Sequence, residues 1–135
     1  MPDASRVLII DDDATVVSAA RRILRAAGAQ VDACGGALEA LALIRGGAEY
    51  DLILCDLIMP PMHGTAFLDV LRVEAPRLAI RVVFITGSPQ AAGHATITQP
   101  GVPMLWKPFG PTELTTLLRQ YQTLASRMSG APCSC

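Results

Sequence analysis

Apolar residues occur along this chain in short unbroken runs, separated by longer stretches with helical spacing. The strongest runs cover residues 6–10, 52–55 and 82–85, and each is followed directly by a polar residue. Runs that are apolar at every position, rather than at every second one, are typical of strands buried on both faces of a sheet. Shorter runs at 30–33 and 104–106 predict two weaker strands.

The stretches between these runs predict helices, because their apolar residues recur three or four positions apart. They cover residues 14–27, 37–45, 67–75 and 111–124. Gly28 stands where the first helix would end, and Pro111 opens the last. Residues 88–101 predict at most a marginal helix, since Gly93 and three threonine or isoleucine positions weaken it. Prolines and a glycine make residues 59–64 a loop.

The alternation of strand and helix, five times over, predicts the fold class. Strands that are apolar throughout and alternate with amphipathic helices are typical of an α/β protein, with a parallel sheet covered by helices on both faces. A chain of 135 residues matches one domain of ordinary size. We therefore expect a single domain over residues 1–128, followed by a disordered C-terminal tail at 129–135.

Composition and charge argue against several partners. Eleven Lys and Arg against twelve Asp and Glu give a formal net charge of −1, which offers no basic surface for direct contact with nucleic acid. No apolar run approaches the roughly 18 residues that span a bilayer, and we expect no membrane contact. Cys34 and Cys55 lie in or beside apolar segments and Cys133 and Cys135 in the tail, a pattern that favours a reduced, cytoplasmic protein.

Polar residues follow the predicted strands at the point where ligands bind in an open parallel sheet. They are Asp11, Asp12 and Asp13 after the first strand, Asp56 after the third, Thr86 after the fourth and Lys107 after the fifth. Carboxylates that converge on one spot repel each other unless a cation lies among them, and oxygen ligands suit Mg²⁺. We expect Asp12 to bind the metal directly, Asp11 to bind it through water, and Asp13 to cap the first helix.

Thr86 and Lys107 add a hydroxyl and an ammonium beside this metal, which suits an incoming phosphoryl group. Lys107 is the single lysine among eleven basic residues, and its point charge is not equivalent to an arginine fork. Asp56, alone at the end of a central strand, is best placed to accept the phosphoryl group covalently. Each of these residues alone is more often a helix cap or a surface charge, and it is their combination that carries the prediction.

Four ordered segments resemble the receiver domain of two-component response regulators, and the resemblance runs from about Arg6 to Leu124. The segments are Val7 to Asp13, Asp56 to Gly64, Ile85 to Gly87 and Lys107 to Phe109. The resemblance implies a flavodoxin-like, doubly wound sheet of five parallel strands in the order 2-1-3-4-5. It also implies a signalling switch in which Asp56 accepts a phosphoryl group from a histidine kinase or a histidine phosphotransfer protein.

The same resemblance implies a role for each matching residue. Asp11, Asp12, Asp56 and the backbone carbonyl of Ile58 would hold Mg²⁺. Thr86 would move to bond the phosphoryl group, and Lys107 would pair with it and precede a cis peptide bond to Pro108. A downstream protein would bind the face formed by residues 88–101, 104–106 and the final helix, while a homodimer is left open.

Several positions depart from the family pattern. Met104 stands where the family usually has the Tyr or Phe that rotates on activation, so Met104 would take that switch position without a ring. His63 replaces a common Asp, and we interpret it as a solvated loop residue; Trp106 is interpreted as core or edge packing. Without a ring at Met104, we expect ordering of residues 88–101 to convey activation.

Two alternatives stay open beside a stand-alone regulator. The chain could be the receiver fragment of a hybrid histidine kinase, which the sequence does not distinguish from a separate protein. It could also be a Mg²⁺-dependent phosphatase of the aspartyl-phosphate type, although such enzymes place a second Asp where this chain has Ile58. The set of site residues argues against a degenerate receiver, and we expect a phosphoacceptor that catalyses only its own phosphorylation and dephosphorylation.

Overall fold

The structure, a computed structural model, describes the backbone of residues 5–128 and the side chains of residues 5–122. Its centre is one sheet of five parallel strands in the order β2-β1-β3-β4-β5. The strands are β1 (Arg6–Ile10), β2 (Gln30–Cys34), β3 (Leu52–Asp56), β4 (Val82–Thr86) and β5 (Met104–Trp106). The expected strand order is confirmed. The expected disordered tail, with Cys133 and Cys135, lies outside the described residues, as does the side chain of Leu124.

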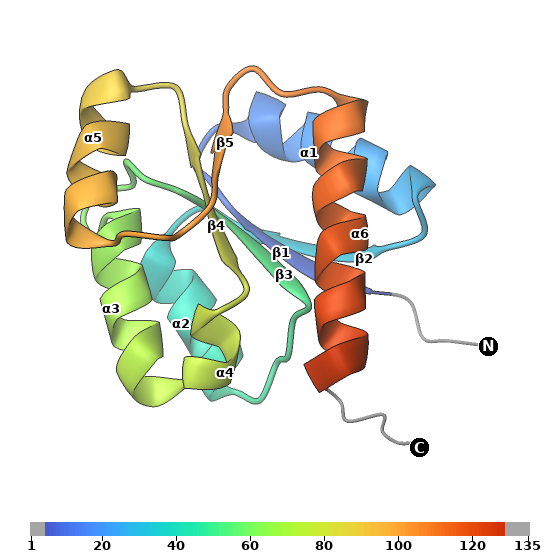
Figure 1. The fold of residues 1–135 in the computed structure, drawn as a ribbon, viewed down its shortest axis with the longest axis horizontal. Helices are drawn as coiled ribbons and strands as arrows, with labels where there is room; N and C mark the ends of the chain where they lie inside the picture. The colour runs from blue at the N-terminus through green and yellow to red at the C-terminus, as the bar shows by residue number, and fades with distance from the viewer. Residues whose placement is uncertain (1–4, 129–135) are drawn as a thin grey trace.

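Helices cover both faces of this sheet (Figure 1). On one face lie α1 (Ala14–Ala26) and α6 (Pro111–Met128). On the other lie α2 (Ala37–Arg45), α3 (Gly64–Glu74), α4 (Pro76–Ala79) and α5 (Pro89–Thr98). The short α4 is an element that the sequence pattern did not predict. Of the helices within residues 5–128, none combines the length and apolar character that a membrane crossing requires.

The unbroken apolar runs are explained by burial on both sides of the sheet. In β1, Leu8 and Ile10 pack into the core under α2 and α3, whereas Val7 and Ile9 pack into the core under α1 and α6. All four side chains are fully buried. A strand that faces two cores has no solvent side on which a polar residue could be placed, so the run stays apolar until the strand ends.

The ends of α1 are set by local sequence, as predicted. The Asp13 carboxylate accepts hydrogen bonds from the backbone N–H of Thr15 at 2.9 Å and of Val16 at 3.4 Å. These bonds satisfy donors that have no partner inside the helix. At the other end Gly28 has a φ of +96°, the left-handed conformation that glycine adopts without a steric penalty. The expected role of Asp13 as a helix cap is confirmed.

Residues 89–98 form the helix α5, although local propensity predicted a marginal helix at most. Contacts with neighbouring residues in the fold stabilise this helix where its own sequence does not. Ser88 caps the first turn by accepting a hydrogen bond from the Ala91 N–H at 3.1 Å. Beyond the last turn, the Gln99 side chain is buried, and its Nε2 donates to Asp69 Oδ1 at 2.5 Å. The helix is therefore anchored at both ends by contacts that a propensity scale does not contain.

Gly64, the first residue of α3, allows this helix to begin directly against the end of β3. A Cβ atom at Gly64 would lie 2.6 Å from the backbone oxygen of Asp56 and 3.3 Å from the Cys55 sulfur. The first of these contacts is with backbone, which cannot move aside without displacing the strand end. A glycine is thus required here by close approach and not by an unusual backbone angle.

We expect the same substitution to have opposite effects at two glycines. Gly64→Ala should lower the free energy of unfolding by about 1–3 kcal/mol, because the new methyl group meets the Asp56 carbonyl. Gly93→Ala should raise it by about 0.5–1 kcal/mol, because Gly93 lies inside α5 with open space around its Cβ position. Urea unfolding of both variants measures the difference, and a neutral Gly64→Ala would contradict the packing described for α3.

Candidate functional site

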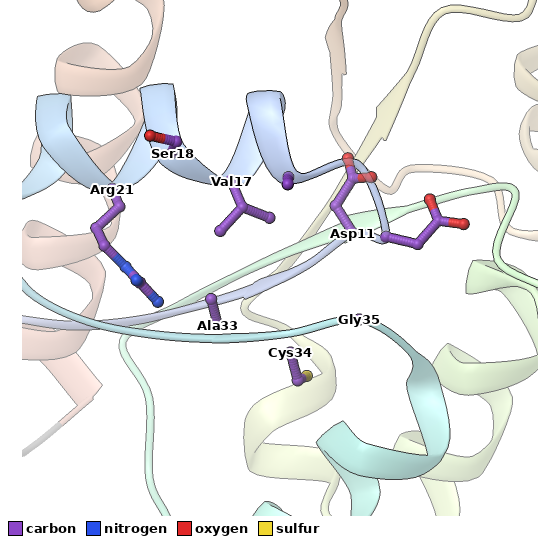
Figure 2. Close-up of a pocket in the computed structure, with 9 residues that line it drawn as sticks. Asp11, Val17, Ser18, Arg21, Ala33, Cys34 and Gly35 are labelled. Atoms are coloured by element: carbon purple, nitrogen blue, oxygen red, sulfur yellow. The ribbon is translucent and has the colours of Figure 1, made fainter.

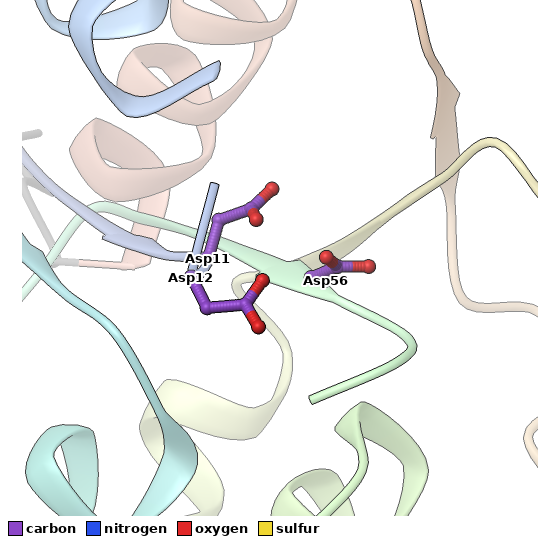
Figure 3. A group of neighbouring side chains, drawn as sticks. All are labelled: Asp11, Asp12 and Asp56. Atoms are coloured by element: carbon purple, nitrogen blue, oxygen red, sulfur yellow. The ribbon is translucent and has the colours of Figure 1, made fainter. Parts of the chain in front are cut away.

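Three carboxylates meet at the ends of neighbouring strands. Asp56 is the last residue of β3, and Asp11 and Asp12 directly follow β1. Because β1 and β3 are paired with Ile10 opposite Cys55, the residues that follow these two lie side by side. Asp11, Asp12 and Asp56 each offer a carboxylate oxygen, and these oxygens all lie within 4.8 Å of one another (Figure 3). Asp11 and Asp56 are buried, whereas Asp12 is exposed.

Lys107 directly follows β5, which is separated from β3 by β4, and brings a positive charge to these carboxylates. Its Nζ lies 3.0 Å from Asp11 Oδ2 and 3.2 Å from Asp56 Oδ2. The peptide bond from Lys107 to Pro108 is cis, as the resemblance implied. The one lysine of the chain is therefore an ion-pair partner of both buried carboxylates.

Burial and charge shift the pKa values of this group. Burial is the main cause that raises the pKa of Asp56, and the negative charge of Asp11 adds to it. A hydrogen bond from the Ile58 N–H and the charge of Lys107 oppose that rise without cancelling it. Burial by itself lowers the pKa of Lys107, but the bonds and charges of Asp11 and Asp56 outweigh it and raise that pKa. The lysine is thus held in its charged form.

The donor set at this site fits a small divalent cation. Asp11 Oδ1 accepts a hydrogen bond from the Asp13 N–H at 2.9 Å. Asp11 Oδ2 is buried and, beyond its ion pair with Lys107, accepts no hydrogen bond from the described residues. A buried carboxylate oxygen with few partners is suited to binding a metal ion. Because the neighbouring Asp12 is exposed, water molecules could complete the coordination of such an ion.

Thr86 and Ile58 also lie at this edge of the sheet. Thr86, at the end of β4, is 1% exposed, and its hydroxyl accepts a hydrogen bond from the Ser88 N–H at 3.0 Å. That bond directs the hydroxyl toward the start of α5. The Ile58 N–H donates to Asp56 Oδ1 at 3.2 Å, while the Ile58 side chain is 47% exposed. The family resemblance implied a role for the Ile58 carbonyl and not this N–H contact.

The remaining candidates have mixed outcomes. Met104 is half-buried in β5, opposite Phe84, and Trp106 is 48% exposed on the same edge strand, which agrees with edge packing. His63 is exposed, but its Nδ1 accepts a hydrogen bond from the Met59 N–H at 3.1 Å. The exposure of His63 agrees with its interpretation as a solvated loop residue, but that interpretation did not include this hydrogen bond. Its position in the loop after Asp56 was the signal that could have indicated a contact.

A cavity of about 510 Å³ reaches the carboxylates from the side of α1 (Figure 2). Its walls come from α1, including Val17 and Arg21, and from the end of β2, including Ala33 and Cys34. Asp11 and Asp12 are also among the residues that line it. The exposed carboxylate of Asp12 is therefore reached from an open hollow and not through a closed core.

Comparison with known proteins identifies the family. The profile described as the response regulator receiver domain matches residues 7–119 of this chain. That match covers most of the chain and contains all the residues of the site described above. The chain therefore belongs to the response regulator receiver domain family, whose members act in two-component signalling together with histidine kinases.

Individual relatives agree with this assignment. The chain is 31% identical over 118 residues to the transcription factor SKN7 of Chaetomium thermophilum, covering 86% of this chain and 15% of SKN7. It is 30% identical over 115 residues to the DNA-binding response regulator MtrA of Mycobacterium tuberculosis, covering 84% of this chain and 49% of MtrA. The chain thus spans about half or less of the length of these curated relatives.

Solved structures show the same fold. The chemotaxis response regulator CheY4 of Vibrio cholerae matches with a TM-score of 0.73 and 27% identity, covering 87% of this chain and 98% of CheY4. A CheY-like receiver domain protein from Methanospirillum hungatei matches with a TM-score of 0.79 and 24% identity, covering 93% of this chain and 99% of that chain. At this identity the second match supports the fold alone.

We expect Asp56→Asn to stabilise the metal-free protein near neutral pH. The folded-state pKa of Asp56 is raised above its ordinary value of 3.8, so the folded state loses stability as pH rises from about that value through the folded pKa. At pH values above the folded pKa, burial and the charge of Asp11 make the ionised Asp56 carboxylate unfavourable in the folded state. Asparagine carries no charge and avoids this loss of stability. Thermal unfolding in EDTA should give a higher Tm for Asp56→Asn at pH 7 and a smaller difference near pH 4. A variant that is less stable at pH 7 would contradict this account.

Proposed function

We propose that this receiver domain is a phosphoacceptor switch, phosphorylated on Asp56 by a histidine kinase or a histidine phosphotransfer protein in a Mg²⁺-dependent reaction. The observation that carries the proposal is the position of the Asp56 carboxylate. Its oxygen lies within 4.8 Å of those of two acidic residues suited to a metal ion, and 3.2 Å from the ammonium of Lys107. A carboxylate with a metal site and an ammonium beside it favours an incoming group that bears several anionic oxygens.

The transfer needs one bond to form and one to break. An Asp56 carboxylate oxygen attacks the phosphorus of a phosphohistidine, an O–P bond forms, and the N–P bond breaks with its electron pair left on the imidazole nitrogen. Asp11, Asp12, Asp56 and the Ile58 carbonyl would hold Mg²⁺, which when bound screens the negative charge between carboxylate and phosphoryl oxygens. The Ile58 N–H, bonded to Asp56 Oδ1, and Lys107, near Oδ2, fix the orientation of the nucleophile.

Phosphorylation would be communicated through Thr86. Its hydroxyl bonds to the Ser88 backbone, and Ser88 is the residue that caps α5. If the Thr86 hydroxyl turns to a phosphoryl oxygen on Asp56, that bond to Ser88 is lost and the start of α5 is released. Because residues 89–98 already form a helix, we propose this release in place of the ordering of residues 88–101 expected from the sequence. We propose that the resulting change is read on the face formed by α5, β5 and α6, where Ile97 and Trp106 are exposed. Met104 lies in the same strand but has no ring to rotate.

The same geometry bears on the alternatives. A phosphatase of the aspartyl-phosphate type would need a general acid two residues beyond Asp56, and Ile58 supplies none. We therefore propose a switch that acts on no free substrate. A stand-alone regulator and the receiver of a hybrid histidine kinase share this chemistry.

In MtrA, which is named as DNA-binding, the matched region is about half of the protein, and we propose no direct nucleic acid contact for this domain. A cytoplasmic location stays a prediction, and a homodimer is left open.

Incubation with acetyl phosphate and Mg²⁺ should add one phosphoryl group to the protein, detected as a mass increase. Asp56→Asn should abolish the increase, because the amide is not a nucleophile toward phosphorus. Asp13→Asn is the matched control, since Asp13 caps α1 and asparagine is an equally good cap. If neither acetyl phosphate nor a phosphorylated histidine kinase gives a mass increase in the wild type, the proposed function is wrong.

The lifetime of the phosphoryl group should depend on Ile58. Loss of the group requires a water molecule in line with the O–P bond, and the Ile58 side chain, half-exposed beside Asp56, offers that water no hydrogen bond. If positioning the water contributes about 1.4–2.8 kcal/mol, Ile58→Asn should speed dephosphorylation roughly 10- to 100-fold. Decay of the phosphorylated protein after donor removal measures this. Ile80→Asn, at a similarly exposed isoleucine before β4, should decay like the wild type.

A further inference from the structure

His63 makes a contact that the proposed mechanism has not used. It is the residue before α3, the position from which a side chain could cap the helix, yet it makes no capping hydrogen bond. Its ring instead faces back across the loop, where Nδ1 accepts a hydrogen bond from the Met59 N–H at 3.1 Å. Nδ1 can act as an acceptor only when it carries no proton, so the neutral ring has its proton on Nε2.

The Met59 N–H belongs to the same peptide group as the Ile58 carbonyl. The cis peptide bonds of the described chain are Pro60–Pro61 and Lys107–Pro108, so the Ile58–Met59 bond is trans. In a planar trans peptide the N–H and the C=O point in opposite directions. An acceptor that holds the Met59 N–H on one side therefore sets the direction of the Ile58 carbonyl on the other.

This loop offers few other means of holding that peptide group. The two residues after Met59 are prolines, which have no N–H to donate. The Met59 side chain is 1% exposed and packs in the core, so its N–H needs a protein partner. On the preceding side, the Ile58 N–H is bonded to Asp56 Oδ1 at 3.2 Å. The two consecutive peptide groups around Ile58 are thus each held, the preceding one by Asp56 Oδ1 and the one that carries the Ile58 carbonyl by the His63 imidazole.

We propose that His63 is a positioning residue for the metal site: by accepting the Met59 N–H, it holds the Ile58 carbonyl oxygen in the direction that a divalent cation at Asp11, Asp12 and Asp56 requires. This inference rests on the proposed function, which places Mg²⁺ at those carboxylates. A hydrogen bond on the N–H side also polarises the amide and strengthens its oxygen as a ligand. Groups that orient metal ligands in this way typically change metal affinity 10- to 100-fold when removed.

The test is a Mg²⁺ titration of the metal-free protein, followed by calorimetry and by the fluorescence of Trp106, which is adjacent to Lys107. His63→Ala should bind Mg²⁺ about 10- to 100-fold more weakly than the wild type. His63→Asn should bind within a few-fold of the wild type, because its Oδ1 can take the place of Nδ1 as acceptor. His94→Ala, at an exposed histidine of α5, is the matched control and should bind like the wild type.

A second measurement needs no metal. Amide hydrogen exchange of Met59 in the metal-free protein should be faster in His63→Ala than in the wild type, and restored in His63→Asn. Unchanged Met59 exchange in His63→Ala would overturn the inference, and so would equal losses of Mg²⁺ affinity in the Ala and Asn variants.

Asp12→Ala separates this inference from the proposed function. If the wild type binds Mg²⁺, Asp12→Ala does not, and His63→Ala binds like the wild type, the positioning role is wrong while the metal site stands. If the wild type itself binds no Mg²⁺, the proposed metal site fails and the role of His63 fails with it.

Discussion

The burial of Asp11 and Asp56 side by side is the constraint on which this site depends. Two carboxylates removed from water repel each other, and the ammonium of Lys107, about 3 Å from both, is the charge that offsets this in the metal-free protein. The offset is incomplete, because the pKa of Asp56 stays raised. A site with uncompensated negative charge is suited to a divalent cation. The two carboxylates also hold the Lys107 ammonium close to Asp56, where it could contact an anionic phosphoryl group.

The sheet supplies the rigidity that holds these charges together. Parallel pairing brings the ends of β1 and β3 to the same edge, and burial of both faces prevents either strand from sliding in register. Gly64 lets α3 pack directly against the backbone of Asp56, so the position of this residue is supported by the start of the helix. A Cβ at Gly64 would lie 2.6 Å from the Asp56 backbone oxygen, so it would displace the helix or the strand end and thereby change the separation of the carboxylates.

The helix α5 is tied at both ends to elements of the site. Its first turn is capped by Ser88, which bonds to Thr86, and its far end is held to α3 by Gln99 through Asp69 and the Thr65 carbonyl. Its own sequence favours a helix only weakly. A helix that is stabilised mainly by such anchors changes its stability when an anchor is released, which gives the proposed movement of Thr86 a physical route to a distant surface.

The sequence by itself determined the strands, most of the helices, and the residues at the strand ends. These follow from local patterns: apolar runs, helical spacing, and caps such as Asp13. The tertiary structure decided what local patterns do not contain. Lys107 meets Asp56 across a separation of 51 residues, and α5 forms through Ser88 and Gln99 despite poor propensity. His63, although exposed, accepts a hydrogen bond from the Met59 N–H. In each case a buried or charged group takes a hydrogen-bond or ion-pair partner that lies near it only in the folded chain. Local sequence patterns do not contain such partners, so they could not predict these contacts.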